Sequence, residues 1–458
     1  MKIKIQKIYA WSIVLEPMTF FVLGNQSLTG VGANISRLLQ IATLLFLVRL
    51  AIVGNINLRI SGFTKRYTSF VLYFSLAVMS GVIGLLMGVY SLGPVSDGVN
   101  IAFPAVLINS PYFRPIFEYV VLAYYIIYFA VLPSIILKKE EDVKYFFKVF
   151  FLMFNISLFV GLIGILLYWQ YGINIVGRHL YEWYTTGARS VGFRFHGFFG
   201  EPRDAFVVLG LGAAFYYLKS IIFNKPQSKC YYALLLICLY FTRSFSGMVG
   251  VAIFIMIYLV INCLELNLKL VIKTFILVSV LSVSFYFAIV NSFRLQLYVY
   301  GLTVGLKGMF FENITPRSFE GQMNNIYPIR WIFDNLSQFN PIPLLLGGGV
   351  GSVSIVNNFY GAIGSVNNPN AGIVRVIAET GIIGCSLYIT AFYIPVKRMT
   401  MQLSYRIRNN IIMSMVLVLS LSLGQRSAAN FIFIGVLFAA FNTLTEANLK
   451  KHEDSLRQ

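Results

Sequence analysis

Residues 145–168 read YFFKVFFLMFNISLFVGLIGILLY, and the only charged side chain in this stretch is that of Lys148. A helix needs about 20 consecutive apolar residues to cross the hydrocarbon core of a bilayer, so this stretch predicts a transmembrane helix. The whole chain has the same character, since 58% of its residues are hydrophobic and 12% are charged. Soluble domains contain about 25% charged residues. The sequence therefore predicts an all-α polytopic integral membrane protein.

Further apolar stretches predict about 12 transmembrane helices in a single transmembrane domain, residues 1–458. Met1–Lys7 runs straight into the first span without a small-residue cleavage site, so we expect no cleaved signal peptide. The predicted spans are 8–24, 36–53, 67–90, 116–137, 145–168, 203–222, 230–242, 245–263, 269–290, 371–396, 410–424 and 428–445.

The basic residues indicate how these spans are oriented. Short cytoplasmic loops of membrane proteins are enriched in lysine and arginine. If the N- and C-termini are both cytoplasmic, the inner segments contain most of the lysines, among them Lys138, Lys139, Lys450 and Lys451. The basic residues that remain for the outer side are then all arginines except Lys307.

This arginine bias on the outer side has a chemical meaning. The planar guanidinium makes two parallel hydrogen bonds to phosphate or carboxylate and keeps its charge, so the bias indicates a site for an anionic substrate. The alternative is that single arginines reach lipid headgroups or pair with acidic residues. Topology explains the inner charge, so the basic composition gives no reason to expect nucleic acid. The inner loops are also too short to bind a nucleotide.

Two predicted outer loops are long enough to contain a site, residues 170–202 and residues 291–369, the second between the ninth and tenth spans. A structureless loop of about eighty residues would be unusual, so we expect short helices in it. Residues 324–339, NNIYPIRWIFDNLSQF, have the apolar period of a helix that lies at the membrane interface or packs on other outer loops. Its predicted apolar face consists of Ile329, Ile332, Phe333, Leu336 and Phe339.

The first loop ends in GARSVGFRFHGFFGEPRDAFVVLG, residues 187–210. Pro202 suits the first turn of the following helix, so the free amides at that helix N-terminus would lie in the same region. This density of charge favours a site, although the glycines also suit turns and Glu201 also suits an ion pair with Arg203. The polar residues of this segment are Arg189, Arg194, His196, Glu201, Arg203 and Asp204.

A second polar segment is LLLGGGVGSVSIVNNFYGAIGSVNNPNAGIVRVIAETGIIG, residues 344–384, which enters the tenth span. Arg375 and Glu379 are four residues apart and therefore share one face of that helix. Two charges inside the outer leaflet are costly unless they face a cavity and find partners. They could pair with each other, and Arg375 would then still line the site.

Other polar residues interrupt the apolar spans. FTRSFSG, residues 241–247, breaks two short spans and places Arg243 at the outer surface, and Arg426 lies between the last two spans. Glu16 stands alone in the first span, where we expect a structural partner for its carboxylate. The chain has no HExxH motif, no paired Cys/His spacing and no DxD-like carboxylate pair, so the sequence predicts neither a metal nor another cofactor.

Taken in order on this topology, these segments resemble the O-antigen polymerase and O-antigen ligase superfamily of bacterial membrane glycosyltransferases. RSVGFRFHGFFGEPRDAF is similar to the family's segment of Arg, Gly-Phe and Glu-Pro at the mouth of a helix, and Arg189 and Gly200 match its spacing of an arginine, ten residues and a glycine. FTRSFSG resembles its Ser/Arg break. LLGGGVG and NNPNAGIVRVIAETGIIG resemble its glycine run and its helix closing in Gly-x-x-Gly.

The resemblance favours a polymerase over a ligase. Ligases usually have a histidine eleven residues before the first glycine of the closing pair, and Asn370 occupies that position here. Polymerases often have an arginine within the helix, as Arg375 is here. The implied architecture is GT-C-like, in the bacterial inner membrane, with the site and loops 170–202 and 291–369 on the periplasmic side.

The implied reaction is metal-independent chain elongation of surface polysaccharide. The growing glycan would leave undecaprenyl diphosphate and join a hydroxyl of the incoming undecaprenyl-diphosphate-linked repeat unit. The expected partners are these lipid-linked oligosaccharides, membrane lipids and a chain-length regulator protein. Two alternatives remain open, a ligase that transfers polymer to lipid A-core and a polysaccharide transporter or flippase.

The arginines would neutralise charge that develops on the departing diphosphate and orient the hydroxyl. Glu201 or His196 is the candidate general base. The diphosphate or the sugars would be bound by Arg189, Arg194, Arg243 and Arg375. The full set of expected substrate-binding residues is Arg189, Arg194, Arg203, Arg243, Arg330, Arg375 and Arg426.

Overall fold

The computed structural model describes most of the chain, and helices form the regular structure of the described part. The predicted all-α class is therefore confirmed there. The described residues are 5–21, 34–53, 63–92, 113–172, 176, 194–223, 226–264, 320–359, 372–401, 403–424, 428–443 and the single positions 272, 276, 279, 283 and 290.

Within these residues, six helical stretches are long and apolar enough to cross a membrane. Four shorter apolar stretches agree with predicted spans, whereas the predicted span 269–290 lies almost wholly outside the described residues. Five of the long stretches belong to α3 (Ile35–Ile52), α4 (Phe63–Leu86), α8 (Glu140–Tyr171), α10 (Pro202–Phe223) and α18 (Gly372–Thr400). The sixth is formed by α6 (Phe113–Tyr125), the π-helix Ile126–Val131 and α7 (Leu132–Ile136), which follow one another without a break. The shorter ones belong to α11 (Lys229–Thr242), α12 (Phe245–Leu264), α19 (Tyr405–Gly424) and α20 (Ala429–Thr443).

The first helix is shorter than the predicted span 8–24. α1 covers Ile5–Leu15 and is followed by a turn and a 3-10 turn at Thr19–Phe21. Pro17 accounts for the early end, because proline has no amide hydrogen to continue the helix and disfavours helical backbone in the residue before it.

The core of the bundle is made by α8, α10 and α20, whose aromatic rings interlock. Phe215 of α10 lies edge-on to Phe150 of α8, with ring centroids 4.9 Å apart, and stacks on Phe433 of α20 at 5.9 Å. α20 is buried on all sides from residue 429 to residue 440. α3 instead leaves apolar side chains outside, with Ile52 80% exposed. Such surfaces suit contact with lipid, so α20 is a central helix and α3 a peripheral one.

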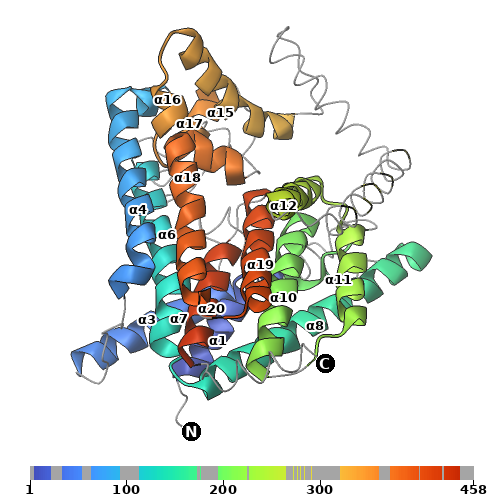
Figure 1. The fold of residues 1–458 in the computed structure, drawn as a ribbon. Coiled ribbons are helices and arrows are strands. Elements are labelled where there is room, and N and C mark those ends of the chain that lie inside the picture. Colours follow the sequence, from blue (N-terminus) through green and yellow to red (C-terminus); the bar gives the residue numbers. More distant parts are fainter. Residues whose placement is uncertain are drawn as a thin grey trace.

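The described residues 320–359 of the segment 291–369 form three helices, which lie at one end of the bundle. Figure 1 shows them together above α18 and beside the upper end of α4. They pack on one another and on α18, so this part of the chain is joined to the membrane-type helices. These helices are α15 (Glu320–Ser337), α16 (Ile342–Leu346) and α17 (Ser352–Phe359).

The buried face of α15 differs from the predicted apolar face. Trp331 and Ile332 are buried, whereas Phe333 is 51% exposed and Phe339 is 95% exposed. The helix ends at Ser337, so Phe339 lies beyond it. The prediction that Phe339 belongs to this helix face is therefore wrong. Trp331, which the predicted face does not include, packs on the neighbouring glycine run. The exposed side chain of Phe333 agrees with the alternative in which the predicted face lies at the membrane interface.

Candidate functional site

The tenth predicted span is broken in the middle, and the glycine run fills the break. Gly381 in α18 has φ 67° and ψ −174°, which interrupts the helical hydrogen bonds. The carbonyl oxygens of Ala378 and Glu379 accept instead from the amides of Gly348 and Gly349, both at 2.9 Å. Backbone polar groups in a membrane need such internal partners. The glycine run is therefore part of the structure of α18.

This packing brings backbone against backbone, which explains the glycines. A Cβ at Gly347, which has φ 75°, would overlap the backbone of α18, and a Cβ at Gly381 would overlap the backbone of Leu345. On the other side, a Cβ at Gly84 of α4 would overlap the carbonyl of Gly348. The glycine run is thus wedged between α4 and α18, at the level of the charges on α18.

Arg375 lies beside this wedge, between two carboxylates. Its Nε donates to Oε1 of Glu379 at 3.0 Å, and its Nη2 lies 2.8 Å from Oε2 of Glu118 on α6. The backbone amide of Gly351 donates to the same oxygen of Glu379 at 3.0 Å. All three charged residues are less than a tenth exposed. We call Arg375, Glu118 and Glu379 the Arg375 cluster.

The Arg375 cluster differs from an ordinary ion pair, because two buried carboxylates contact one guanidinium. The Nη1 atom of Arg375 is also buried without a hydrogen-bond partner among the described residues. Buried donors in proteins are almost always satisfied. The cluster therefore has a donor group, Nη1 of Arg375, that its contacts among the described residues do not use.

A cavity of about 110 Å³ adjoins the cluster. Its walls come from α6, the first turns of α18 and α20 and the end of α19, together with Tyr73 of α4, Val350 and Tyr388 further along α18. The lining residues are Tyr73, Glu118, Val121, Leu122, Tyr125, Val350, Gly372, Arg375, Val376, Glu379, Tyr388, Ser422, Leu423 and Phe431.

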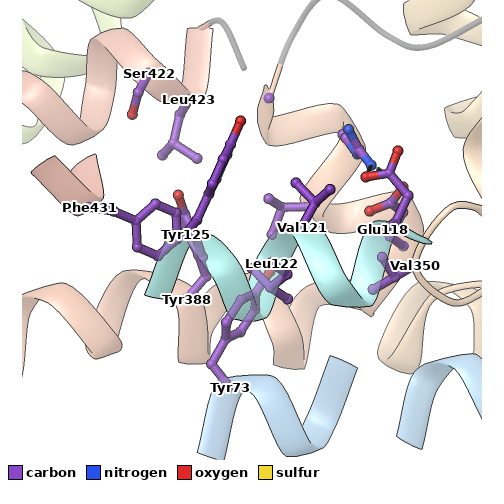
Figure 2. A pocket seen from close by; sticks show the side chains of 14 residues that line it. Tyr73, Glu118, Val121, Leu122, Tyr125, Val350, Tyr388, Ser422, Leu423 and Phe431 are labelled. Carbon is purple, nitrogen blue, oxygen red and sulfur yellow. Dashed lines mark hydrogen bonds and ion pairs between the residues drawn. The ribbon is translucent and has the colours of Figure 1, made fainter. Parts of the chain in front are cut away.

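The cavity has a charged side and an aromatic side (Figure 2). Glu118, Val121 and Tyr125 follow one another along α6 at spacings of three and four residues, so they share the helix face toward the cavity. Figure 2 shows Glu118 at one end of this face and Tyr125 at the other, near Phe431 and Tyr388. The site therefore combines charged hydrogen-bonding groups with aromatic ring faces.

The segment before α10 is organised differently, because Arg194 is bonded to the backbone at the end of another helix. Nε of Arg194 donates to the carbonyl of Thr242 at 3.1 Å, and its Nη2 lies 3.5 Å from the carbonyl of Arg243. Beside it, the amide of Phe195 donates to the carbonyl of Phe241 at 2.8 Å. The last carbonyls of a helix lack partners within the helix, and a cation there is favourable. Arg194 thus stabilises the end of α11.

His196 is buried in the same segment and is held neutral. Its Nδ1 lies 3.1 Å from the carbonyl oxygen of Gly197, to which it donates in the matching tautomer. Burial lowers the pKa of His196 to about 4, and the positive charge of Arg194 adds to the effect. A base with that pKa is weak at neutral pH. The environment is therefore unfavourable for the predicted role of His196 as general base.

Glu201 and Arg203 form the ion pair that the sequence left open. Nε of Arg203 lies 2.6 Å from Oε2 of Glu201, with side chains 40% and 18% exposed. Arg243 is exposed and has φ 47°, the left-handed conformation in which many helices end. It separates α11 from α12, at the predicted break. Arg203 and Arg243 therefore lie at helix ends where solvent reaches them.

The 194–204 segment and the cavity lie toward the same end of the bundle. Close approaches show how the helices align, since Cβ atoms built at Gly210 of α10 and Gly250 of α12 both meet Leu421 of α19. α10 begins shortly before Gly210, α12 begins shortly before Gly250, and α19 ends shortly after Leu421. The starts of α10 and α12 thus face the same way as the end of α19, which lines the cavity.

The remaining predicted site residues fall elsewhere. Arg330 of α15 is 39% exposed and lies 3.9 Å from Asp334. Arg189 and Arg426 lie outside the described residues. Glu16 has the structural partner that was predicted, since its carboxylate pairs with Arg37 at 2.7 Å.

Sequence reasoning missed Glu118 and the aromatic side of the cavity. Glu118 lies within the predicted span 116–137, and a lone carboxylate in an apolar span was the available signal. Tyr125 and Phe431 gave no signal, because aromatic residues are common throughout the chain. Only packing brings the two helices together.

The described residues contain no group of three or more His, Cys, Asp or Glu side chains arranged to hold a metal ion. No family model matches the chain, and no curated protein matches it significantly.

Proposed function

We propose that this protein is a glycosyltransferase that polymerises undecaprenyl-diphosphate-linked oligosaccharide repeat units. The oxygen of a hydroxyl on the incoming unit forms a bond to the anomeric carbon of the growing glycan. The bond between that carbon and the diphosphate oxygen breaks, undecaprenyl diphosphate leaves with the bonding electrons, and the hydroxyl proton passes to a base. In this proposal the chain has about 12 spans and a GT-C-like architecture in the bacterial inner membrane, with the site on the periplasmic side.

One observation supports this proposal above the others: a charged and aromatic cavity beside Arg375, inside an apolar helical bundle. Three buried charges in such a bundle are costly, and ionisable groups within membrane segments mark substrate pathways by default. Carboxylates, a guanidinium and aromatic rings are suited to a saccharide. The end of α19 and the starts of α18 and α20 contribute to the walls, so we infer that a substrate anchored in the membrane approaches from that end of the bundle.

The diphosphate requires cations of its own. Arg203 and Arg243 are accessible to solvent, and the helices next to them begin at the end of the bundle toward which the cavity lies. Guanidinium groups neutralise the charge that develops on a departing diphosphate without a metal ion. This arrangement supports a division of the site, with glycan at the cavity and diphosphate nearer the arginines of the helix ends.

The genetic test is electrophoresis of the surface polysaccharide from a strain that lacks this chain. A polymerase predicts that a single repeat unit remains attached to the cell surface. A ligase predicts polymer that stays on undecaprenyl diphosphate, and a flippase predicts lipid-linked units that remain on the cytoplasmic face. A null strain with a normal polymer ladder contradicts the proposal.

The biochemical test uses the purified chain in lipid nanodiscs with undecaprenyl-diphosphate-linked repeat units. We expect longer lipid-linked glycans, with release of undecaprenyl diphosphate for each bond formed and no requirement for added metal. The Arg189→Ala, Arg375→Ala double variant should be inactive. The matched control is Arg49→Ala, which removes an exposed arginine near the end of α3, outside the expected site residues. Normal elongation by a well-folded double variant would show that these two arginines are not part of the site.

A further inference from the structure

We propose that Arg37 is a further substrate-binding residue, which donates hydrogen bonds to the diphosphate of a lipid-linked substrate, and that Glu16 is its positioning residue. The inference rests on the proposed function in taking the ligand to be a lipid diphosphate. Arg37 lies in the first turn of α3, outside the arginine-containing motifs of the sequence.

The carboxylate of Glu16 holds one edge of the Arg37 guanidinium. Its Oε1 accepts from Nη2 of Arg37 at 2.7 Å. Its Oε2 accepts from Oγ of Ser36 at 2.8 Å and from Nε2 of Gln40 at 2.7 Å. The side chain of Glu16 is only 8% exposed, and a negative charge is favourable near the N-terminus of a helix such as α3. Three donors from the start of α3 therefore fix the carboxylate, and the carboxylate fixes Nη2.

The rest of the guanidinium is available to a ligand. Arginine has five N–H donors, and the hydrogen bonds of Arg37 to the described residues use two of them, one to Glu16 and one to Gln40 at 3.4 Å. The side chain is 39% exposed. It also lies over the ring of Tyr124, 5.6 Å from the centroid, which favours one orientation of the guanidinium plane. The remaining groups only donate, so they suit a ligand that presents acceptor oxygens, as a phosphate does.

Arg37 adjoins the 194–204 segment, which contains one of the arginines proposed for the diphosphate. Its partner Glu16 is three residues before Thr19, so the chain between them spans about 11 Å at most. Oγ1 of Thr19 donates to the carbonyl oxygen of Phe199 at 2.6 Å, and aromatic rings of the two segments stack beside this bond. The turn after α1 therefore joins the Glu16–Arg37 pair to the 194–204 segment.

Arg37 also adjoins the cavity. Tyr125 lines the cavity (Figure 2), and its hydroxyl interacts electrostatically with the guanidinium of Arg37. The hydroxyl of Tyr124 donates to Gln40, which holds this part of α6 against the start of α3. In the proposed substrates the diphosphate is bonded directly to a sugar, so the ligands of the diphosphate must lie beside the glycan. Arg37 meets this requirement, because it adjoins both the cavity wall and the 194–204 segment.

Phospholipid headgroups present the same phosphate chemistry, so the test must separate the two sources. It measures binding of farnesyl diphosphate to the full chain in phosphatidylcholine nanodiscs by isothermal titration calorimetry, with protein-free nanodiscs as the blank. These nanodiscs present headgroup phosphate in excess. If Arg37 binds only headgroups, its loss should leave the affinity for farnesyl diphosphate unchanged, whereas the proposal predicts weaker binding.

Two variants of Arg37 decide the question. Arg37→Gln should weaken binding of farnesyl diphosphate about tenfold, the loss of one charge-assisted hydrogen bond. Arg37→Lys keeps the positive charge beside Glu16 but lacks the planar fork, so it should still bind more weakly than wild type, and it is the deciding variant if Arg37→Gln does not fold. The matched control is Arg49→Gln, which removes an exposed arginine from the other end of the same helix and should leave the affinity unchanged.

The positioning role of Glu16 needs a readout that stability alone does not move. Glu16→Asp keeps the negative charge but shortens the side chain, so it should release Nη2 of Arg37 and weaken binding in folded protein. In the Arg37→Gln background, Glu16→Asp should have no further effect on affinity, because the residue that it positions is gone. A lower melting temperature with unchanged affinity in Glu16→Asp would contradict this role.

Unchanged affinity in folded Arg37→Gln and Arg37→Lys would overturn the proposal. Equal losses in Arg37→Gln and Arg49→Gln would overturn it as well, because they would reflect the overall charge of the chain. So would wild-type protein that binds no farnesyl diphosphate at millimolar concentration. The elongation assay separates these results from the proposed function: binding that depends on Arg37 without elongation supports this subsite and contradicts the polymerase, and elongation with binding that does not depend on Arg37 does the reverse.

Discussion

Two regions of this protein use arginine in opposite ways. In the Arg375 cluster, the guanidinium is buried between the carboxylates of Glu118 and Glu379, at the wall of a cavity. In the 194–204 segment, Arg194 is bonded to backbone carbonyls at the end of α11, and Arg203 pairs with Glu201 near solvent. The residue type is the same, but Arg375 is buried between carboxylates, whereas Arg194 is bonded to backbone carbonyls.

This difference shows that an arginine-rich motif does not by itself define a binding site. The partner of each guanidinium decides how much of it remains available for a ligand. Arg194 is largely committed to its helix cap, whereas Arg375 has a buried nitrogen with no partner among the described residues. The two regions should therefore respond differently to substitution, and four measurements test this.

The largest effect is expected for Arg375→Ala. The change removes the guanidinium that contacts the buried carboxylates of Glu118 and Glu379, so we expect the free energy of unfolding to fall by about 3–5 kcal/mol. Adding Glu118→Gln should recover part of the loss, because it removes one of the two buried negative charges that Arg375 contacted. Thermal unfolding in detergent measures both. Arg330→Ala is the control and should cost less than about 1 kcal/mol, so equal stability of the two alanine variants would show that the cluster is not buried as described.

The next effect concerns the wedge of the glycine run against α18. Gly347→Ala introduces a side chain at φ 75° where the backbone of α18 leaves no room, so we expect a loss of about 2–4 kcal/mol from strain and overpacking. Gly172→Ala is the matched control, since Gly172 has φ 68° but open space around its Cβ position. That control should lose only about 1 kcal/mol. Similar losses in the two variants would contradict the close contact with α18.

The third effect is a dependence of stability on pH that comes from the 194–204 segment. The pKa of His196 is lowered to about 4 in the folded protein, whereas an unfolded histidine has a pKa of about 6.5. The unfolded state therefore takes up a proton between these values and the folded state does not. From pH 7 to pH 5 this should reduce the free energy of unfolding by about 2 kcal/mol. Melting temperatures of wild type and His196→Gln across this range measure the term, and equal slopes would disprove the burial of His196.

The smallest effects distinguish the arginines of this segment. Arg194→Ala removes the hydrogen bonds to the end of α11, so we expect a loss of about 1–1.5 kcal/mol. Arg203→Ala breaks a partly exposed pair and should cost less than about 1 kcal/mol. If Arg203 binds the diphosphate, its variant should nevertheless make less polymer at normal protein level. Normal polymer from Arg203→Ala would assign Arg203 to the local pair with Glu201 alone.

Particular residues show how far prediction from the sequence reached. Arg375 and Glu379 were placed on one helix face because a spacing of four residues is a local property of a helix. Glu118 is 257 positions away from Arg375 along the chain, and no local pattern relates α6 to α18. The contact of Trp331 with the glycine run was not predicted for the same reason, because it depends on how α15 packs. The helix break at Gly381 was also not predicted, because its lost hydrogen bonds are replaced by another segment.

By itself, the sequence determined that this is a helical chain with apolar, membrane-type helices, because length and hydropathy are properties of each segment alone. It also located the polar segments in which charges gather. Only the tertiary structure decided that Arg194 stabilises a helix end, that Glu118 joins Arg375, and that aromatic rings of α6, α18 and α20 face them across a cavity. The physical reason is that the availability of a charged group for a ligand depends on its partners in the protein. Tertiary packing determines these partners, because it brings distant parts of the chain together.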